Sequence, residues 1–425
     1  MRSKSLLLGS TLAIAAIAIC WRAAEAHAPL LSSDPAANAK LAVAPTRIRL
    51  KFSEPVDASV SSVQLVASSG IARTLRVASD PHDVAALLAP IDGALRGSYR
   101  VVWRTVSVDG HPVDGSFLFS VADTSRAPAA IPPPAPASVD RTTFFSRAVG
   151  FTRGATILLL MSTLGILWFG RLAGASEARA VRLCSWLAIA ALVAMTVHFI
   201  VWATGDSPRG SFDPGWIGRM AETRPGRLEI VRWFAMALVV WALVLARRPS
   251  VGLLFGAVAV GVSGAIGHPS ALVNPALAIP VSVAHLFAAS VWLGGLSWLA
   301  IVGRTETSRM PTEAHRVSEI ALWSVIAVFL TGGAQTLLFV TPMGDLFRTA
   351  YGQVLMLKIA GVLMLVGIGA YHRYRVVPRV QAGGFGASLR AEIVLMAIVI
   401  VIAGVLASLS PRLATPQTPP SALAS

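Results

Sequence analysis

Residues 99–121, YRVVWRTVSVDGHPVDGSFLFSV, decide the fold of the N-terminal part of the chain. Apolar and polar side chains alternate in 99–104 and again in 117–121, which is typical of strands that bury one face. The pair Asp109-Gly110 between them is a turn signal. These residues therefore predict two neighbouring strands joined by a turn, in which Asp109 and His111, two residues apart, point the same way.

The flanking residues extend this pattern. Residues 47–52 alternate in the same way, and further turn signals lie at 53–55, 69–70 and 92–93. About seven short strands in fewer than 100 residues predict an all-β Greek-key sandwich, immunoglobulin-like or cupredoxin-like, over residues 27–122. Residues 123–146 contain a proline-rich run and are expected to be a linker with polyproline II character.

A signal peptide is expected to precede the sandwich, over residues 1–26. Arg2 and Lys4 form a charged start, residues 6–19 are apolar, and residues 24–26 read Ala-Glu-Ala, a small-residue cleavage site. Cleavage after residue 26 would make His27 the first residue of the mature chain. We therefore expect the sandwich to be exported.

The rest of the chain is apolar enough to lie mostly in lipid. Mean hydropathy is +0.67, and 55% of residues are hydrophobic. Segments of roughly twenty apolar residues are long enough to cross a bilayer, and residues 147–410 are therefore predicted to form an all-α bundle of eight transmembrane helices, with 411–425 as a tail. The expected spans are 147–170, 181–203, 229–247, 250–267, 276–301, 317–340, 351–372 and 389–409.

Charge distribution sets the expected orientation. The formal charge of +15 comes almost entirely from arginines in short clusters between apolar segments, so we expect a lipid bilayer and no nucleic acid as partner. Most of these clusters fall in loops that are cytoplasmic if the sandwich lies outside; the arginines between the second and third spans are the exception. The sequence thus predicts a multi-pass protein of a bacterial inner membrane with its N-terminal domain in the periplasm.

An N-terminal histidine is a chelating group, because its α-amine and imidazole can bind one metal ion together. Pro29 has no amide hydrogen to lose, so the remaining ligands must come from elsewhere in the fold. Asp109 and His111 would complete a set of three nitrogens and one oxygen, which favours Cu(II) over Cu(I). The alternative is that Asp109-Gly110 is only a turn and His111 a surface residue. His82 is a weaker candidate.

Residues 27–122 also resemble the CopC family of periplasmic copper-binding proteins. The resemblance is carried by His27-Ala28-Pro29-Leu30, Ser33-Asp34-Pro35-Ala36, residues 50–56 and residues 99–117. It implies a copper-binding sandwich with Cu(II) ligands at His27, Asp109 and His111. Some members of that family have a methionine-rich Cu(I) site, but residues 27–122 contain no methionine, so we expect no such second site.

Histidines within or beside the predicted spans are candidate functional residues, because ionisable groups at membrane depth are costly. His198, His268 and His285 fall toward the outer side of the expected topology. With Met195 and Met356, near the outer ends of two spans, they would form a copper path of imidazole and thioether groups. The alternatives are interhelical hydrogen bonding for the histidines and packing for the methionines. The copper valence in this half is left open.

Residues from about 150 to 410 resemble the CopD family, membrane partners of CopC associated with copper handling and import. The resemblance is carried by Gly267-His268, residues 284–296, residues 351–358 and residues 389–392. It implies that the chain joins a CopC-like and a CopD-like domain.

Together these observations predict a copper-homeostasis protein that is not an enzyme. We expect the sandwich to bind copper outside the membrane, with periplasmic copper donors as candidate partners, and to pass it to the helices for import without ATP. A membrane-anchored copper buffer or resistance protein is one alternative. A redox protein with haem held by helix histidines is the other.

Overall fold

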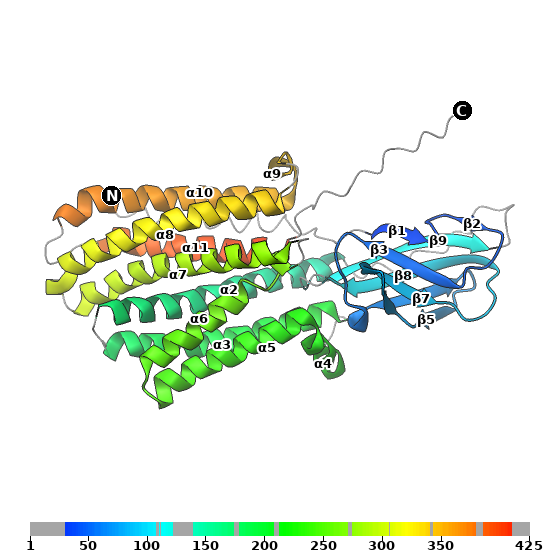
Figure 1. Ribbon diagram of the computed structural model, residues 1–425, viewed down its shortest axis with the longest axis horizontal. Coiled ribbons are helices and arrows are strands. Elements are labelled where there is room, and N and C mark those ends of the chain that lie inside the picture. The colour runs from blue at the N-terminus through cyan, green and yellow to red at the C-terminus, as the bar shows by residue number, and fades with distance from the viewer. Residues whose placement is uncertain are drawn as a thin grey trace.

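The computed structural model describes a β-sandwich followed by a helix bundle (Figure 1). Its described residues are 30–107, 110, 112–121, 139–173, 178–207, 212–270, 274–305, 307–340, 343–379 and 386–409. The predicted signal peptide and C-terminal tail lie outside these residues, and so do all three predicted Cu(II) ligands, His27, Asp109 and His111.

The sandwich consists of two packed sheets, as predicted. The first has the strand order β1-β3-β7-β6 and the second β2-β9-β8-β4-β5. The strands are β1 Leu30–Asp34, β2 Lys40–Leu41, β3 Arg47–Phe52, β4 Ser62–Ala67, β5 Ala72–Leu75, β6 Ala78–Asp80, β7 Asp83–Pro90, β8 Gly97–Val106 and β9 Pro112–Val121.

The two neighbouring strands predicted within residues 99–121 are confirmed by the pairing of β8 with β9. Their antiparallel register runs from Gly97 opposite Val121 to Val106 opposite Pro112, so the connection at residues 107–111 lies at one end of the sandwich. Inward side chains from both sheets meet in the core, where the rings of Phe52 and Trp103 lie 5.2 Å apart. Burial of these apolar faces is the main stabilising contribution.

The bundle contains every one of the eight predicted helical segments. Two further short helices, α4 and α9, lie between them. The helices are α2 Val139–Leu172, α3 Ala178–Asp206, α4 Pro214–Glu222, α5 Arg224–Val240, α6 Pro249–Ser263, α7 Pro275–Thr305, α8 Met310–Phe339, α9 Asp345–Arg348, α10 Ala350–Tyr371 and α11 Gly386–Leu406. Helix α2 begins at Val139, so the last part of the predicted linker 123–146 is already helical.

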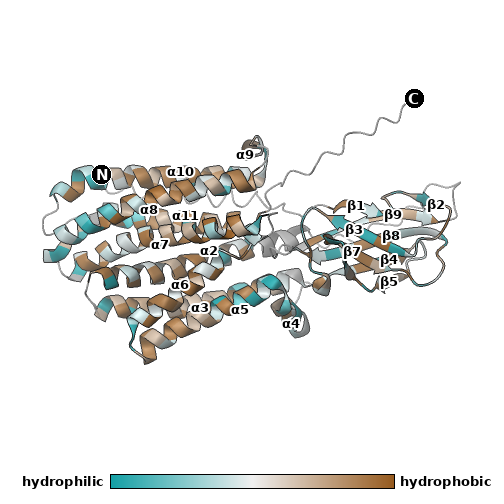
Figure 2. Ribbon diagram, viewed as in Figure 1, coloured by the Kyte–Doolittle hydropathy of each residue, from teal (hydrophilic) through white to brown (hydrophobic). Residues whose placement is uncertain are grey.

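Seven of the helices in the described residues are long and apolar enough to cross a membrane. The remaining predicted span, 250–267, corresponds to α6, which is apolar but has only 15 residues. Figure 2 shows hydrophobic residues along the middle of the helices and hydrophilic ones toward their ends, as a lipid environment requires.

Helix α2 lies at the centre of the bundle and contacts α3, α6, α7 and α11. It approaches α7 and α11 closely at small residues, because Gly165 faces Gly294 and Gly154 faces Gly404. A Cβ at these glycines would collide with the neighbouring backbone. These glycines therefore permit close helix packing.

The two ends of the bundle differ in what they carry. The end next to the sandwich, called the sandwich end below, carries α4, α9 and the short helix η3, His268–Ser270 (Figure 1). The opposite end, called the far end, carries two π-helical turns, Trp241–Leu245 after α5 and His372–Val376 after α10.

Candidate functional site

The turn between β8 and β9 is anchored to the sandwich at its base. Ser107 donates its hydroxyl to the buried carboxylate of Glu54 at 3.0 Å, and its carbonyl accepts from Gly110 N at 2.9 Å. Gly110 has a φ of +91°, a left-handed conformation that suits glycine. Its neighbours Asp109 and His111 lie outside the described residues.

The start of β1 lies at the same end of the sandwich as this turn. Leu30 pairs with Phe52, the last residue of β3, and a few residues later Val56 pairs with Ser107. His27 precedes Leu30 by three residues, a distance that an extended chain covers in roughly 10 Å. This placement supports the prediction that His27, Asp109 and His111 meet, which stays a prediction.

The turn rests directly on the sandwich end of the bundle. Trp202, in the last part of α3, donates its indole Nε1–H to the carbonyl of Gly110 at 2.8 Å. A Cβ at Gly110 would lie 3.3 Å from the Trp202 ring and 3.7 Å from Pro225 at the start of α5. A second hydrogen bond, 3.2 Å long, joins Arg104 of β8 to the carbonyl of Gly205.

Apolar side chains reinforce this contact. Val60 and Val106 of the sandwich are buried in one cluster with residues of α3 and α4, namely Trp202, Ala203, Trp216 and Met220. Helix α4 starts at an N-cap, Asp213, whose carboxylate accepts from the backbone N–H groups of Gly215 and Trp216. The cap and the cluster together fix α4 against the sandwich.

His198 lies one helical turn below Trp202 on α3, and only 1% of its side chain is exposed. Its Nδ1 is 2.9 Å from the hydroxyl of Thr152 on α2, and its Nε2 is 3.9 Å from a carboxylate oxygen of Glu229 on α5. The second oxygen of Glu229 binds Arg232, which is also buried. An imidazole and a carboxylate therefore face each other beneath the docked turn.

The other predicted membrane histidines have different neighbours. His268, in η3, is buried beside the rings of Phe339 and Tyr351, with ring centroids 6.1 and 5.9 Å away. His285, on α7, lies 2.9 Å from the hydroxyl of Thr331 on α8. His198 is thus held by α2, α3 and α5, whereas His268 and His285 are held on the side of α8 and α10.

The two predicted methionines also differ. Met195 is buried in the main apolar cluster of the bundle, together with Cys184 and Met236. Met356 is 37% exposed on α10 and so faces away from the buried interior. Across the described part of the chain, His, Cys, Asp and Glu side chains form no group of three or more that could hold a metal ion.

Sequence reasoning missed Trp202 and Glu229, although both carried a signal. Glu229 is an acid at the start of an apolar span, where an ionisable group is costly without a partner. Trp202 follows His198 by four residues and therefore shares its helix face. The identity of their partners, Gly110 and His198, depends on long-range packing that residue spacing does not encode.

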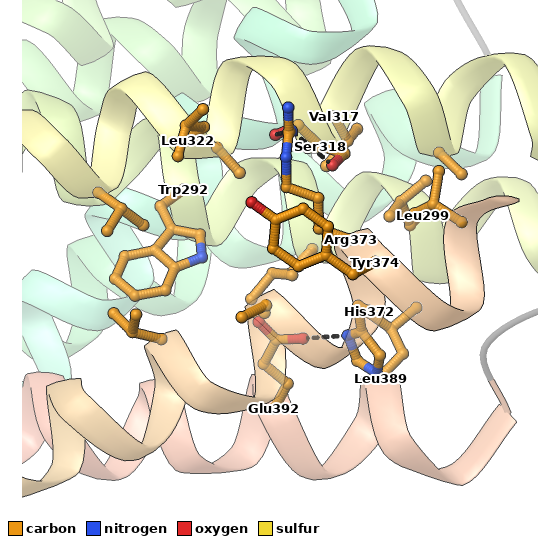
Figure 3. A pocket seen from close by; sticks show the side chains of 18 residues that line it. Trp292, Leu299, Val317, Ser318, Leu322, His372, Arg373, Tyr374, Leu389 and Glu392 are labelled. Carbon is orange, nitrogen blue, oxygen red and sulfur yellow. Dashed lines mark hydrogen bonds and ion pairs between the residues drawn. The ribbon is translucent and has the colours of Figure 1, made fainter.

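A cavity of about 160 Å³ lies at the far end, between α7, α8, α10 and α11 (Figure 3). Its walls are largely apolar, with Trp292 on one side. The buried side chains of His372 and Glu392 form an ion pair in it, with Nδ1 2.7 Å from a carboxylate oxygen. Arg373 crosses to α8 and donates to the carbonyl of Ser318 at 2.9 Å. The sequence analysis did not find this pair.

The architecture defines a class: a multi-pass membrane protein with a β-sandwich docked by one end on its helices. Comparison with known proteins gives the family. The CopC domain matches residues 30–122, and Copper resistance protein D matches residues 311–406. The chain belongs to the CopC and CopD families as a fusion of the two, as the sequence predicted.

Several known proteins are similar to this chain. The Copper transport protein CutJ of Bacillus subtilis is 25% identical over 90% of this chain and 74% of its own length. Protein YobA of Escherichia coli strain K12 is 36% identical over 28% of this chain and 99% of its own length. The crystal structure of CopC from Methylosinus trichosporium OB3b is 28% identical, with a TM-score of 0.22, covering 22% of this chain and 93% of that chain.

Proposed function

We propose that the sandwich binds Cu(II) outside the membrane through His27, Asp109 and His111 and hands copper to the helices beneath it. The helices then pass copper toward the cytoplasm. The observation that carries this proposal is the seating of the turn on the bundle. Gly110, the residue between two of the three proposed ligands, accepts a hydrogen bond from Trp202 of the bundle.

Direct docking favours delivery within one chain over capture and release into solution. A domain held at the entrance of the bundle presents its cargo at a high effective concentration. The relatives are consistent with this role, because CutJ is named a copper transport protein and matches 90% of this chain.

The proposal is tested by ⁶⁴Cu uptake into cells under limiting copper. Deleting the gene should lower the rate of uptake. His27→Ala should lower it when copper is scarce and recover at high copper, because it weakens capture, whereas His285→Ala should lower the flux at all copper concentrations. His315→Ala is the matched control, since this histidine is exposed on α8.

Three outcomes would contradict the proposal. Unchanged copper accumulation after deletion would exclude import. Changed copper tolerance with an unchanged rate of uptake would indicate a buffer or resistance protein. A Soret band in the purified protein would indicate haem and a redox function. His82→Ala tests the competing ligand on the sandwich and should leave capture unchanged.

A further inference from the structure

The hydroxyl of Thr152 determines which nitrogen of His198 carries a proton. The Thr152 Oγ1 lies 2.8 Å from the carbonyl of Ala148, which can only accept, so the single hydroxyl hydrogen points there. The same oxygen lies 2.9 Å from His198 Nδ1 and must accept from it. In a neutral imidazole, this leaves the lone pair on Nε2.

The lone pair on Nε2 faces another acceptor. The nearest oxygen of Glu229 is 3.9 Å from Nε2, too far for a hydrogen bond. Two metal–ligand bonds of about 2.0 Å each would span this distance when the two ligands lie nearly opposite one another across the ion. The gap therefore has the size that a single metal ion in a nearly linear arrangement needs.

The surroundings of the gap match those of a ligating histidine. Such a histidine usually donates its other ring N–H to a neighbouring group, which fixes the tautomer and the ring orientation. His285 repeats the arrangement, because Thr331 donates to the carbonyl of Ala327 and lies 2.9 Å from His285 Nδ1. His198 and His285 thus share the same threonine contact at Nδ1.

The gap lies where the helix bundle would receive copper from the sandwich. His198 precedes Trp202 by four residues, about 6 Å along the helix, and Trp202 touches the turn that would carry two copper ligands. The side chains of His198 and Glu229 are 1% and 6% exposed, so an ion between them would be shielded from water.

We propose that His198 Nε2 and the Glu229 carboxylate form the first copper-binding site of the helix bundle, which receives the ion from the sandwich. This inference rests on the proposed function and adds a carboxylate ligand to it. Arg232 binds Glu229, and Arg153 lies close enough to act on His198 electrostatically. Two guanidinium groups disfavour an added cation, so copper binds here weakly, as a site of passage requires.

Copper binding to the purified full-length protein tests this site without requiring transport. A background variant, His27→Ala, removes the tight site of the sandwich. Equilibrium dialysis with ⁶⁴Cu, as Cu(II) and separately as Cu(I) under a reductant, should then show one weak site. His198→Ala and Glu229→Gln should each abolish it, and Thr152→Val should weaken it about tenfold because it releases the imidazole.

Controls separate ligation from loss of structure. His315→Ala and Glu319→Gln change exposed residues of α8 and should leave the weak site intact. Glu229→Gln leaves Arg232 buried without its counter-charge, so the double variant Glu229→Gln/Arg232→Gln, which removes both charges, should also lose copper while remaining folded by thermal unfolding.

The two proposals fail in different ways. Weak copper binding that survives His198→Ala and Glu229→Gln in both valences would overturn the receiving site, even if the protein imports copper. Binding that disappears with these variants supports the site, even if uptake by cells is unaffected and the import function is therefore wrong.

Discussion

An imidazole and a carboxylate face each other at both ends of the helix bundle, but only the far-end pair is in direct contact. At the sandwich end, His198 Nε2 and Glu229 are 3.9 Å apart. At the far end, His372 Nδ1 and Glu392 are 2.7 Å apart (Figure 3). Arg232 already neutralises the negative charge of Glu229, so His198 is not needed as the counter-charge of this carboxylate. The same two residue types can therefore play different roles. Where an arginine binds the carboxylate, the histidine stays separate from it; at the far end, the histidine itself pairs with the carboxylate.

The largest expected effect is on stability, and it distinguishes the two ends. His372→Leu should lower the free energy of unfolding by about 3–5 kcal/mol, because it removes one partner of a buried ion pair. His198→Leu should cost clearly less, since Glu229 keeps Arg232. Thermal unfolding of both purified variants in the same detergent measures the difference. An equal loss of stability in the two variants would show that both pairs contribute equally to the free energy of unfolding and would contradict this difference.

A smaller effect concerns the contact between the sandwich and the helices. Trp202→Phe removes the indole donor to Gly110 but keeps an aromatic ring in the cluster. The loss of one hydrogen bond, about 0.5–1.5 kcal/mol, should slow copper transfer from the loaded sandwich by roughly two- to tenfold.

Stopped-flow loss of the Cu(II) absorption of the sandwich measures this transfer. The matched control is Trp233→Phe on α5, which removes a similar indole bond to Thr196 away from the docked turn. An unchanged transfer rate in Trp202→Phe, or an equal loss in the control, would contradict a positioning role for Trp202.

The smallest expected effect is a pH dependence confined to the sandwich. Arg49 lowers the pKa of Asp80 through a hydrogen bond of 2.8 Å, and Lys51 lowers the pKa of Asp83 through one of the same length. A lowered pKa in the folded state contributes stability above the ordinary aspartate value of about 3.9, and this contribution is lost as the pH falls through the lower folded value.

Thermal unfolding of the full chain is measured between about pH 3 and pH 6, a range around the ordinary aspartate pKa of about 3.9. The unfolding temperature of the sandwich should fall below about pH 4. Arg49→Met should flatten this dependence. A steeper fall in the bundle transition than in the sandwich transition would contradict the assignment.

The sequence predicts the fold better than the contacts within it. Alternation in 99–104 and 117–121 predicts β8 and β9 because a strand buries every second side chain, and hydropathy predicts the helices because lipid demands apolar segments. Both patterns are local. The seating of Gly110 on Trp202 and the pairing of Glu229 with His198 join residues far apart in the chain, so no local pattern contains them.

The residues of the candidate site likewise fall into those that the sequence predicts and those that only the structure reveals. A Cu(II) site at His27, Asp109 and His111 is predicted from residue type and from the resemblance to CopC, and it stays a prediction because these residues lie outside the described part of the chain. His198 was found as a buried ionisable group. Its ligand partner and its tautomer became apparent only from the positions of Thr152 and Glu229.

The short length of α6 has a consequence for the surrounding lipid. Fifteen residues rise only about 22 Å, less than the roughly 30 Å of hydrocarbon in a typical bilayer. The short helix η3 follows α6 along the chain, and backbone outside a long helix is tolerated at membrane depth only when protein covers it. His268, Pro269 and Ser270 are indeed buried. The negative end of the α6 dipole consequently lies at the sandwich end of the bundle, where it attracts cations.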